Sequence, residues 1–159
     1  MRILALDPGS MDTGWVLIGE APPAAPLRFG VDPNAVLSSA ITLADFDLLA
    51  IESIPAVYGH SALPALCDAL RWEGRFIERA ERANVPVQLV ARQQVKAWLC
   101  SAAHAKDGDV RAELIRRWGG DTAIGKKAAR GPLYGITSHV WPALAVGAWA
   151  QGNFGEIEP

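Results

Sequence analysis

Short apolar segments that leave no polar face recur along the first ninety residues of the chain. Residues 3–6, Ile-Leu-Ala-Leu, form the clearest one, and such a run is typical of a strand that is buried on both faces of a sheet. Pro8, Gly9 and Gly14 predict the turn that joins the first two strands, and the proline-rich residues 21–33 predict a loop after the second. The predicted strands are residues 2–7, 15–19, 35–42, 47–54 and 85–90.

Apolar positions at three-residue and four-residue steps predict helices in the rest of the chain. The longest such pattern lies between residues 62 and 83. The predicted helices are residues 62–83, 93–100, 109–118 and 137–150. Pro142 is compatible with the last of them, because it falls in the first turn, where a missing N–H costs little. The order of elements predicts an α/β fold, a mixed five-stranded sheet flanked by helices, in a single domain over residues 1–159 with a loosely ordered tail over 151–159.

Charge is unevenly distributed along this chain, whose net charge is −2. Residues 1–70 carry 2 basic and 8 acidic side chains, whereas residues 71–131 carry 13 basic and 7 acidic ones. The middle third therefore predicts a basic surface, and the first third supplies carboxylates. In residues 71–85, however, the interleaved arginines and glutamates favour an ordinary solvated helix. The two cysteines lie far apart and outside any Cys/His cluster of the kind that binds zinc.

Two of the predicted buried strands end on a carboxylate. Asp7 follows Leu6, and Glu52 lies near the end of the strand at 47–54. Carboxylates are ligands that Mg²⁺ prefers, and a strand end holds them rigidly. Two such ions about 4 Å apart can bind the attacking water and the leaving oxygen of a phosphodiester. The alternative interpretation is structural: Asp7 begins a turn and Glu52 marks the exit of a strand.

Five segments follow one another along nearly the whole chain. The first two are ILALDPGSMDTGW and LLAIESI, the third is ARQQVKAW, and the last two are KDGDVRAELI and SHVWPALAVGAW. In this order they resemble the RuvC-type Holliday junction resolvases of the ribonuclease H-like superfamily, and the first segment is specific by itself. The resemblance implies a ribonuclease H-like fold and a Mg²⁺-dependent endonuclease, in which Mn²⁺ substitutes. It also implies a homodimer that cleaves four-way DNA junctions or related branched DNA by the two-metal reaction.

Carried over by position, the resemblance assigns Asp7 and Glu52 as the first two metal-binding carboxylates. The last helix of the family presents an Asp or His and, three residues later, an Asp. His139 fits the first of these positions, because an imidazole can bind the metal or accept a proton from the attacking water. Its alternative is a surface histidine beside a helix cap. Pro142 occupies the second position and has no ligand atom, so the predicted catalytic and metal-binding residues are Asp7, Glu52 and His139.

Pro142 leaves three explanations open. The enzyme works with three protein ligands and water, or another acid such as Asp12 reaches the metal from the first turn, or the chain binds junctions without cutting them. Because Asp7, Glu52 and His139 all remain, lowered or altered activity is favoured over none.

Contacts to DNA are expected from one aromatic residue and from several cations. The resemblance implies an aromatic wedge shortly after the second acid, and Tyr58 is the first aromatic residue there, with a stacking contribution of about 1 to 3 kcal/mol. Cations that bind phosphates make DNA binding salt-dependent. The glycine-bounded segment GKKAARG is expected to be a flexible loop that orders on DNA. The predicted phosphate-binding residues are Arg92, Lys96, Lys106, Arg111, Lys126, Lys127 and Arg130.

Three other functions are compatible with parts of this sequence. The loop DPGSMDTG also resembles the first phosphate loop of actin-type and Hsp70-type ATPases, but those proteins need two such domains. An RNA-processing nuclease of the same superfamily is a less favoured alternative. Such nucleases lack a long helix after the second acid, whereas this sequence predicts one. A non-catalytic or weakly active junction-binding protein is the third. No segment resembles a signal peptide or a membrane span, so we expect a soluble cytoplasmic protein. The resemblance implies that residues 62–83 form the dimer contact.

Overall fold

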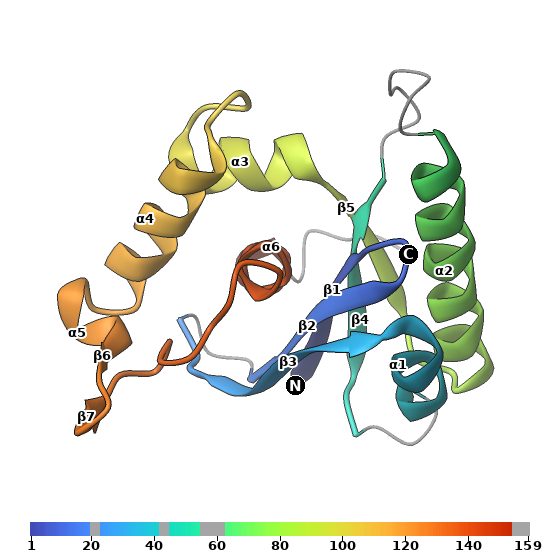
Figure 1. Ribbon diagram of the computed structural model, residues 1–159, viewed down its shortest axis with the longest axis horizontal. Coiled ribbons are helices and arrows are strands. Elements are labelled where there is room, and N and C mark those ends of the chain that lie inside the picture. The colour runs from blue at the N-terminus through green and yellow to red at the C-terminus, as the bar shows by residue number, and fades with distance from the viewer. Residues whose placement is uncertain (20–22, 42–44, 55–62, 154–159) are drawn as a thin grey trace.

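A mixed five-stranded sheet organises the computed structural model, which describes residues 1–19, 23–41, 45–54 and 63–153 (Figure 1). The strands lie in the order β3-β2-β1-β4-β5. They are β1 (Arg2–Pro8), β2 (Asp12–Gly19), β3 (Pro26–Pro33), β4 (Leu48–Ser53) and β5 (Val87–Ala91). β2 pairs antiparallel with both β1 and β3, whereas β1, β4 and β5 run parallel to one another. The mixed sheet predicted from the sequence is confirmed.

Helices cover both faces of this sheet (Figure 1). They are α1 (Asn34–Ile41), α2 (Leu63–Arg82), α3 (Arg92–Cys100), α4 (Asp107–Arg117), α5 (Asp121–Ile124) and α6 (Val140–Asn153). α1 and α2 pack on one face, and α6, with α3 and α4 behind it, packs on the other. A small two-stranded sheet of β6 (Gly125–Lys126) and β7 (Ala129–Arg130) follows α5.

The central strands are buried on both faces, which explains their continuous apolar runs. In β1, Ile3 and Ala5 pack with α6, whereas Leu4 and Leu6 pack with α1 and α2. β4 alternates in the same way, with Ala50 on the side of α6. Successive side chains of a strand point to opposite faces, so each face of these strands must be apolar.

Gly14 lies inside β2 and not in the turn where the sequence placed it. A Cβ at this position would lie 1.7 Å from the carbonyl oxygen of His139, so only glycine lets the chain entering α6 approach the sheet this closely. Gly14 is also the register partner of Asp7. The contact therefore places the backbone of His139 against β2, next to the point where β2 pairs with Asp7 of β1.

The predicted strand over residues 35–42 is wrong, because that segment forms helix α1 and the preceding proline-rich segment forms β3. β3 is an edge strand, where terminal prolines interrupt no essential ladder. Asn34 fixes the start of α1 through three hydrogen bonds. Its backbone N–H donates to the carbonyl of Met11 over 2.9 Å. Its side-chain oxygen accepts from the Thr13 hydroxyl over 2.6 Å, and its side-chain amide donates to the Gly9 carbonyl over 2.9 Å. One buried asparagine thus ties α1 to the loop that follows Asp7.

The remaining elements agree with the sequence predictions to within a few residues. α2 covers almost the whole predicted span, and its exposed Arg82–Glu78 ion pair confirms the solvated character expected of its outer face. α6 begins at Val140, three residues later than expected, and continues to Asn153, into the segment predicted as a loose tail. Within the described ranges, no helix is long and apolar enough to cross a membrane.

Candidate active site

The three parallel strands deliver three charged residues to one edge of the sheet. Asp7 lies near the end of β1, Glu52 near the end of β4, and Arg92 directly after β5. β1 and β4 pair Leu6 with Ile51, so Asp7 and Glu52 come next to each other in register. The carboxyl ends of parallel strands are the usual place for ligand sites in such sheets.

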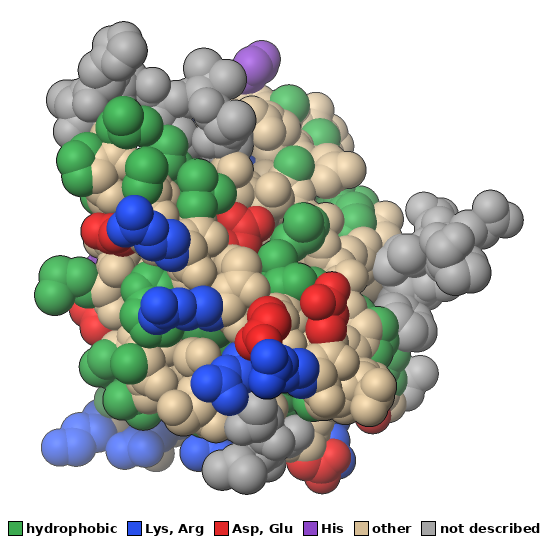
Figure 2. All heavy atoms as spheres, turned by 90° about the vertical axis from the view of Figure 1, so that its right-hand side faces the viewer, with side chains coloured by type: hydrophobic (Ala, Val, Ile, Leu, Met, Phe, Trp, Pro, Cys, Tyr) green, Lys and Arg blue, Asp and Glu red, His purple; other side chains and the backbone are tan. Residues whose placement is uncertain are grey.

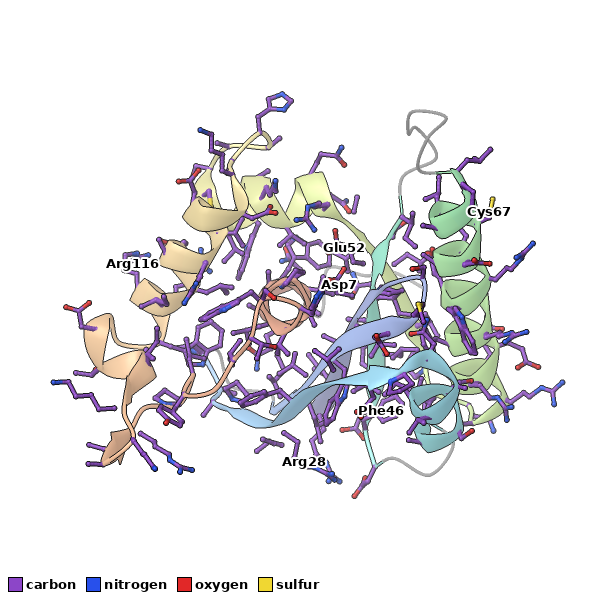
Figure 3. The ribbon with its side chains drawn as sticks, viewed as in Figure 1. Asp7, Arg28, Phe46, Glu52, Cys67 and Arg116 are labelled. Carbon is purple, nitrogen blue, oxygen red and sulfur yellow. The ribbon has the colours of Figure 1, made fainter. Side chains whose placement is uncertain are left out.

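Strand alternation points the acidic side chains toward α6. Ala5 and Ala50 pack on the α6 side of the sheet, and residues two positions further along a strand point to the same side. Asp7 and Glu52 therefore share that side, and they lie side by side near α6 in Figure 3. Glu52 is almost buried, with about a tenth of its side chain exposed. The two carboxylates predicted from the sequence thus meet in the structure.

Asp7 and Glu52 perturb each other strongly. Burial, the negative charge of Glu52 and a hydrogen bond with Glu52 raise the pKa of Asp7 to about 7, and the positive charge of Arg92 opposes the shift. Two carboxylates this close repel when both are ionised. A cation between them relieves that repulsion, and their oxygen donors are those that a hard divalent ion prefers. The pair therefore fits a divalent metal ion.

Arg92 is a cation in direct contact with Glu52. Its Nη1 donates to Glu52 Oε1 over 2.8 Å, and its Nη2 donates to Asp107 Oδ1 over 2.8 Å. Burial alone would lower the pKa of the Arg92 guanidinium, but the hydrogen bonds and charges of Glu52 and Asp107 raise it above its ordinary value. Arg92 is therefore a permanent cation fixed between two carboxylates.

Asp107 is an acid of the site that sequence reasoning missed. It is the first residue of α4, and Lys96 Nζ lies 3.3 Å from its Oδ1 in addition to the contact with Arg92. Burial would raise the pKa of Asp107, but the hydrogen bonds and charges of Arg92 and Lys96 lower it, so its carboxylate is ionised at neutral pH. The sequence feature that could have indicated Asp107 is its place as the first residue of a helix, within the segment KDGDVRAELI.

Two cavities meet at this charged cluster. One, of about 330 Å³, is lined by residues of α3, α4 and α6, among them Lys96, Asp107 and Pro142. The other, of about 320 Å³, lies toward α2 and is lined by Asp7 and the Pro8–Ser10 turn. Glu52 and Arg92 line both cavities and so form the wall between them.

Pro142 occupies the position that the sequence assigned to it. It lines the same cavity as Glu52, so an acid at this position would face the site, whereas proline adds only an apolar wall. Asp12, the proposed substitute, is exposed at the start of β2 and lines neither cavity. Asp107 is the acid that shares the cavity with Pro142 and Glu52.

His139 is only partly brought to the site. Its backbone lies against Gly14, but its side chain is exposed. Over the described part of the chain, no group of three or more His, Cys, Asp and Glu residues is arranged to hold a metal ion. The structure therefore joins Asp7 with Glu52, while the metal-binding role of His139 stays a prediction.

The predicted phosphate-binding residues divide into two groups. Arg92, Lys96 and Arg111 line the cavity beside Glu52, where the Arg111 guanidinium carbon stacks 4.9 Å from the centre of the Trp141 ring, and Lys106 is exposed just before α4. The other three cations lie beyond the far end of α4 (Figure 1). They are Lys126, Lys127 and Arg130.

The segment GKKAARG is not the open loop that was expected, because it forms the β6–β7 hairpin. A Cβ on Gly125 or Gly131 would lie 2.2 Å from a backbone oxygen, so both glycines are needed for close packing at its base. Its ordering on DNA stays a prediction. Tyr58, the predicted wedge, lies outside the described residues.

The order of the strands and the helices on both faces are those of a ribonuclease H-like α/β fold. No protein-family model matches the chain, and no curated protein matches it in sequence. Solved structures do resemble it over nearly its whole length. RuvC of Thermus thermophilus is 19% identical, with a TM-score of 0.72 over 97% of this chain and 95% of that one.

Two further structures extend this likeness. Thermus thermophilus RuvC in complex with a Holliday junction substrate is 22% identical, with a TM-score of 0.67 over 94% of this chain and 92% of that one. The yeast mitochondrial Holliday junction resolvase Ydc2 is 12% identical, with a TM-score of 0.55 over 98% and 82%. The chain therefore has the fold of the RuvC-type resolvases, as the sequence motifs indicated.

Proposed function

We propose that this protein is a divalent-metal-dependent endonuclease that cleaves four-way or related branched DNA. The observation that carries the proposal is the convergence of Asp7 and Glu52 at the carboxyl edge of a RuvC-like sheet. Two resolvases with this fold are described as acting on or binding Holliday junctions. The long helix α2 after β4 is the feature that the RNA-processing alternative lacks.

The residues of the site divide the work of hydrolysis between them. Asp7 and Glu52 would hold the ion, which when bound supplies positive charge to the water nucleophile and to the phosphate. Arg92 and Lys96 bind and orient the phosphate through charge-assisted hydrogen bonds. His139 accepts a proton from the attacking water. The water oxygen bonds to phosphorus, the bond to the leaving sugar oxygen breaks, and that oxygen takes up a proton.

Homodimerisation through α2 belongs to the same proposal. A four-way junction has strands to cut in symmetric pairs, which matches a twofold dimer. Figure 2 shows hydrophobic side chains among arginines and acids on the side of the molecule where α2 lies. Leu63 and Leu70 of α2 are 51% and 41% exposed, which supports contact with a second copy. The mass in solution, measured by light scattering after size exclusion, tests this part.

Cleavage of a labelled four-way junction tests the function directly. The protein is incubated with the junction in Mg²⁺ and separately in Mn²⁺, with Asp7→Asn as control, and the strands are separated on a denaturing gel. We expect paired nicks near the crossover that are absent in the control. Cleavage of single-stranded RNA in preference to the junction would contradict the proposal.

A junction-binding protein without cleavage is the second candidate, and Pro142 is the observation that favours it. In that case the junction shifts on a native gel but shows no nicks on the denaturing one. Pro142→Asp then places a carboxylate in the cavity that Glu52 lines, and gain of nicking would show that this one position silences the site.

A further inference from the structure

Arg92 is a cation that lies between two carboxylates of the candidate site. It bridges Glu52 and Asp107 with two hydrogen bonds of 2.8 Å, and it lines both cavities that meet at the site. Its side chain is 35% exposed, so it is reachable from solvent yet held in place. A guanidinium is planar, always charged and matches carboxylate and phosphate oxygens with paired donors.

The charges of the cluster leave room for a single divalent ion. Three carboxylates, of Asp7, Glu52 and Asp107, interact with two cations, Arg92 and Lys96, so these five groups carry a net charge of −1 when all are ionised. Arg111 lines the same cavity and adds further positive charge. One divalent ion turns the charge of the five groups into +1, whereas two ions would leave +3 in a half-buried site. Proline at position 142 adds no compensating acid. Repulsion between the ions and Arg92 would then be severe.

Asp107 serves Arg92 and not a metal in this arrangement. One of its oxygens accepts from Arg92 and also lies 3.3 Å from Lys96 Nζ. A guanidinium carries five N–H donors, and the bonds to Glu52 and Asp107 use two of them among the described residues. The other donors are available to a phosphate oxygen in the adjoining cavity.

We propose that Arg92 replaces a second metal ion: the site binds one divalent ion on Asp7 and Glu52, and the Arg92 guanidinium, positioned by Asp107, binds the phosphate of the reacting DNA. The proposal rests on the proposed function. Arg92 is then a catalytic residue that contacts the substrate, and Asp107 is a positioning residue.

Counting bound Mn²⁺ tests this without any cleavage assay. Mn²⁺ is titrated into the purified full chain, and the free ion is followed by electron paramagnetic resonance. We expect one bound ion per chain for the wild type and loss of that ion in Asp7→Asn. Arg92→Ala frees Glu52 and Asp107 and should gain a second ion, and Arg92→Ala/Asp107→Asn should return to one.

Controls separate this test from misfolding and from the function itself. Arg116→Ala removes an exposed arginine that also donates two hydrogen bonds to one carboxylate, Glu113, and it should keep one ion. Arg92→Lys preserves the charge if Arg92→Ala fails to fold, and it too should keep one ion. In junction cleavage we expect Arg92→Ala to lose about 10² to 10³-fold in rate.

Each contrary outcome has its own meaning. Two ions on the wild type, or a single ion on a folded Arg92→Ala, would overturn the role of Arg92 while leaving the nuclease proposal intact. No ion on the wild type would overturn both. One ion on the wild type and a second on Arg92→Ala, without junction cleavage by the wild type, would support the Arg92 arrangement and count against the nuclease.

Discussion

Two regions of the molecule carry residues predicted to contact DNA: the carboxyl ends of β1, β4 and β5, and the β6–β7 hairpin. The two regions differ in the burial and the contacts of their charged side chains. At the edge, Glu52 is almost buried and bonded to Arg92 within a cluster of interacting charges. On the hairpin, Lys126 and Lys127 are exposed, and Arg130 stacks on Tyr134 with its guanidinium carbon 5.0 Å from the ring centre. Rigid, desolvated charges suit chemistry, whereas exposed charges contribute affinity that salt weakens.

The distance between the two regions follows from α4. Its 11 residues extend for about 16 Å at the rise of an α-helix, with the site near its first residue and the hairpin beyond its last. A DNA arm that reaches from one to the other would contact both. The two regions should therefore respond to different measurements when they are altered.

The largest effect is expected from Asp7→Asn. Removing one of the two converging carboxylates should lower junction cleavage by at least about 10³-fold, because the ion loses its charge partner. Binding of the junction should be unchanged or tighter, since a negative charge near phosphate is removed. Cleavage on denaturing gels and affinity on native gels check the two parts, and a loss of both would contradict the separation of roles.

His139→Ala should have the next largest effect. Among the described residues, its exposed side chain belongs to no group arranged to hold a metal, so we expect it to act on the proton of the attacking water. Cleavage should fall by about 10²-fold. Mn²⁺ binding, followed by electron paramagnetic resonance, should be the same as in the wild type. Weaker Mn²⁺ binding by the variant would instead assign His139 as a metal ligand.

Asp7 also predicts a dependence of stability on pH. Its pKa rises from 3.8 to about 7 in the folded chain, so the folded state holds the proton more strongly and loses stability as pH increases across that window. Asp7→Asn cannot ionise, and at pH 8 it should be more stable by about 2 to 4 kcal/mol. Near pH 4 the two proteins should unfold at similar urea concentrations.

Mg²⁺ sharpens this comparison. At pH 8 the ion should stabilise the wild type, because it binds the folded site, and it should leave Asp7→Asn unaffected. Equal stability of the two proteins at pH 8 without Mg²⁺ would show that burial and the charge of Glu52 do not disfavour ionisation of Asp7.

The smallest effect is expected from the triple variant Lys126→Ala/Lys127→Ala/Arg130→Ala. The slope of log affinity against log salt concentration should decrease by about 2 to 3, and junction binding should weaken at low salt. Thermal stability should change little, because these side chains are exposed. Arg28→Ala, on β3 and far from Asp7 and Glu52 in Figure 3, is the matched control and should leave the slope unaltered.

The central strands and the edge of the sheet differ in how strongly their sequences indicate their structure. The apolar runs ending at Asp7 and Glu52 predicted buried strands tipped with acids, and the motif order predicted the fold; both are confirmed. β3 and α1 were predicted wrongly, because an edge strand needs no strong apolar pattern and helix α1 is fixed by the contacts of Asn34 with residues twenty or more positions away.

By itself, the sequence determined which residues could carry chemistry at the ends of buried strands, since strand periodicity and burial are local properties. Only the tertiary structure decided that Arg92 lies between Glu52 and Asp107, and that Asp107 and Pro142 line one cavity. These residues come from β4, α3, α4 and α6, separated by up to 90 positions (Glu52 to Pro142). Their meeting depends on how helices pack on the sheet, which no local pattern encodes.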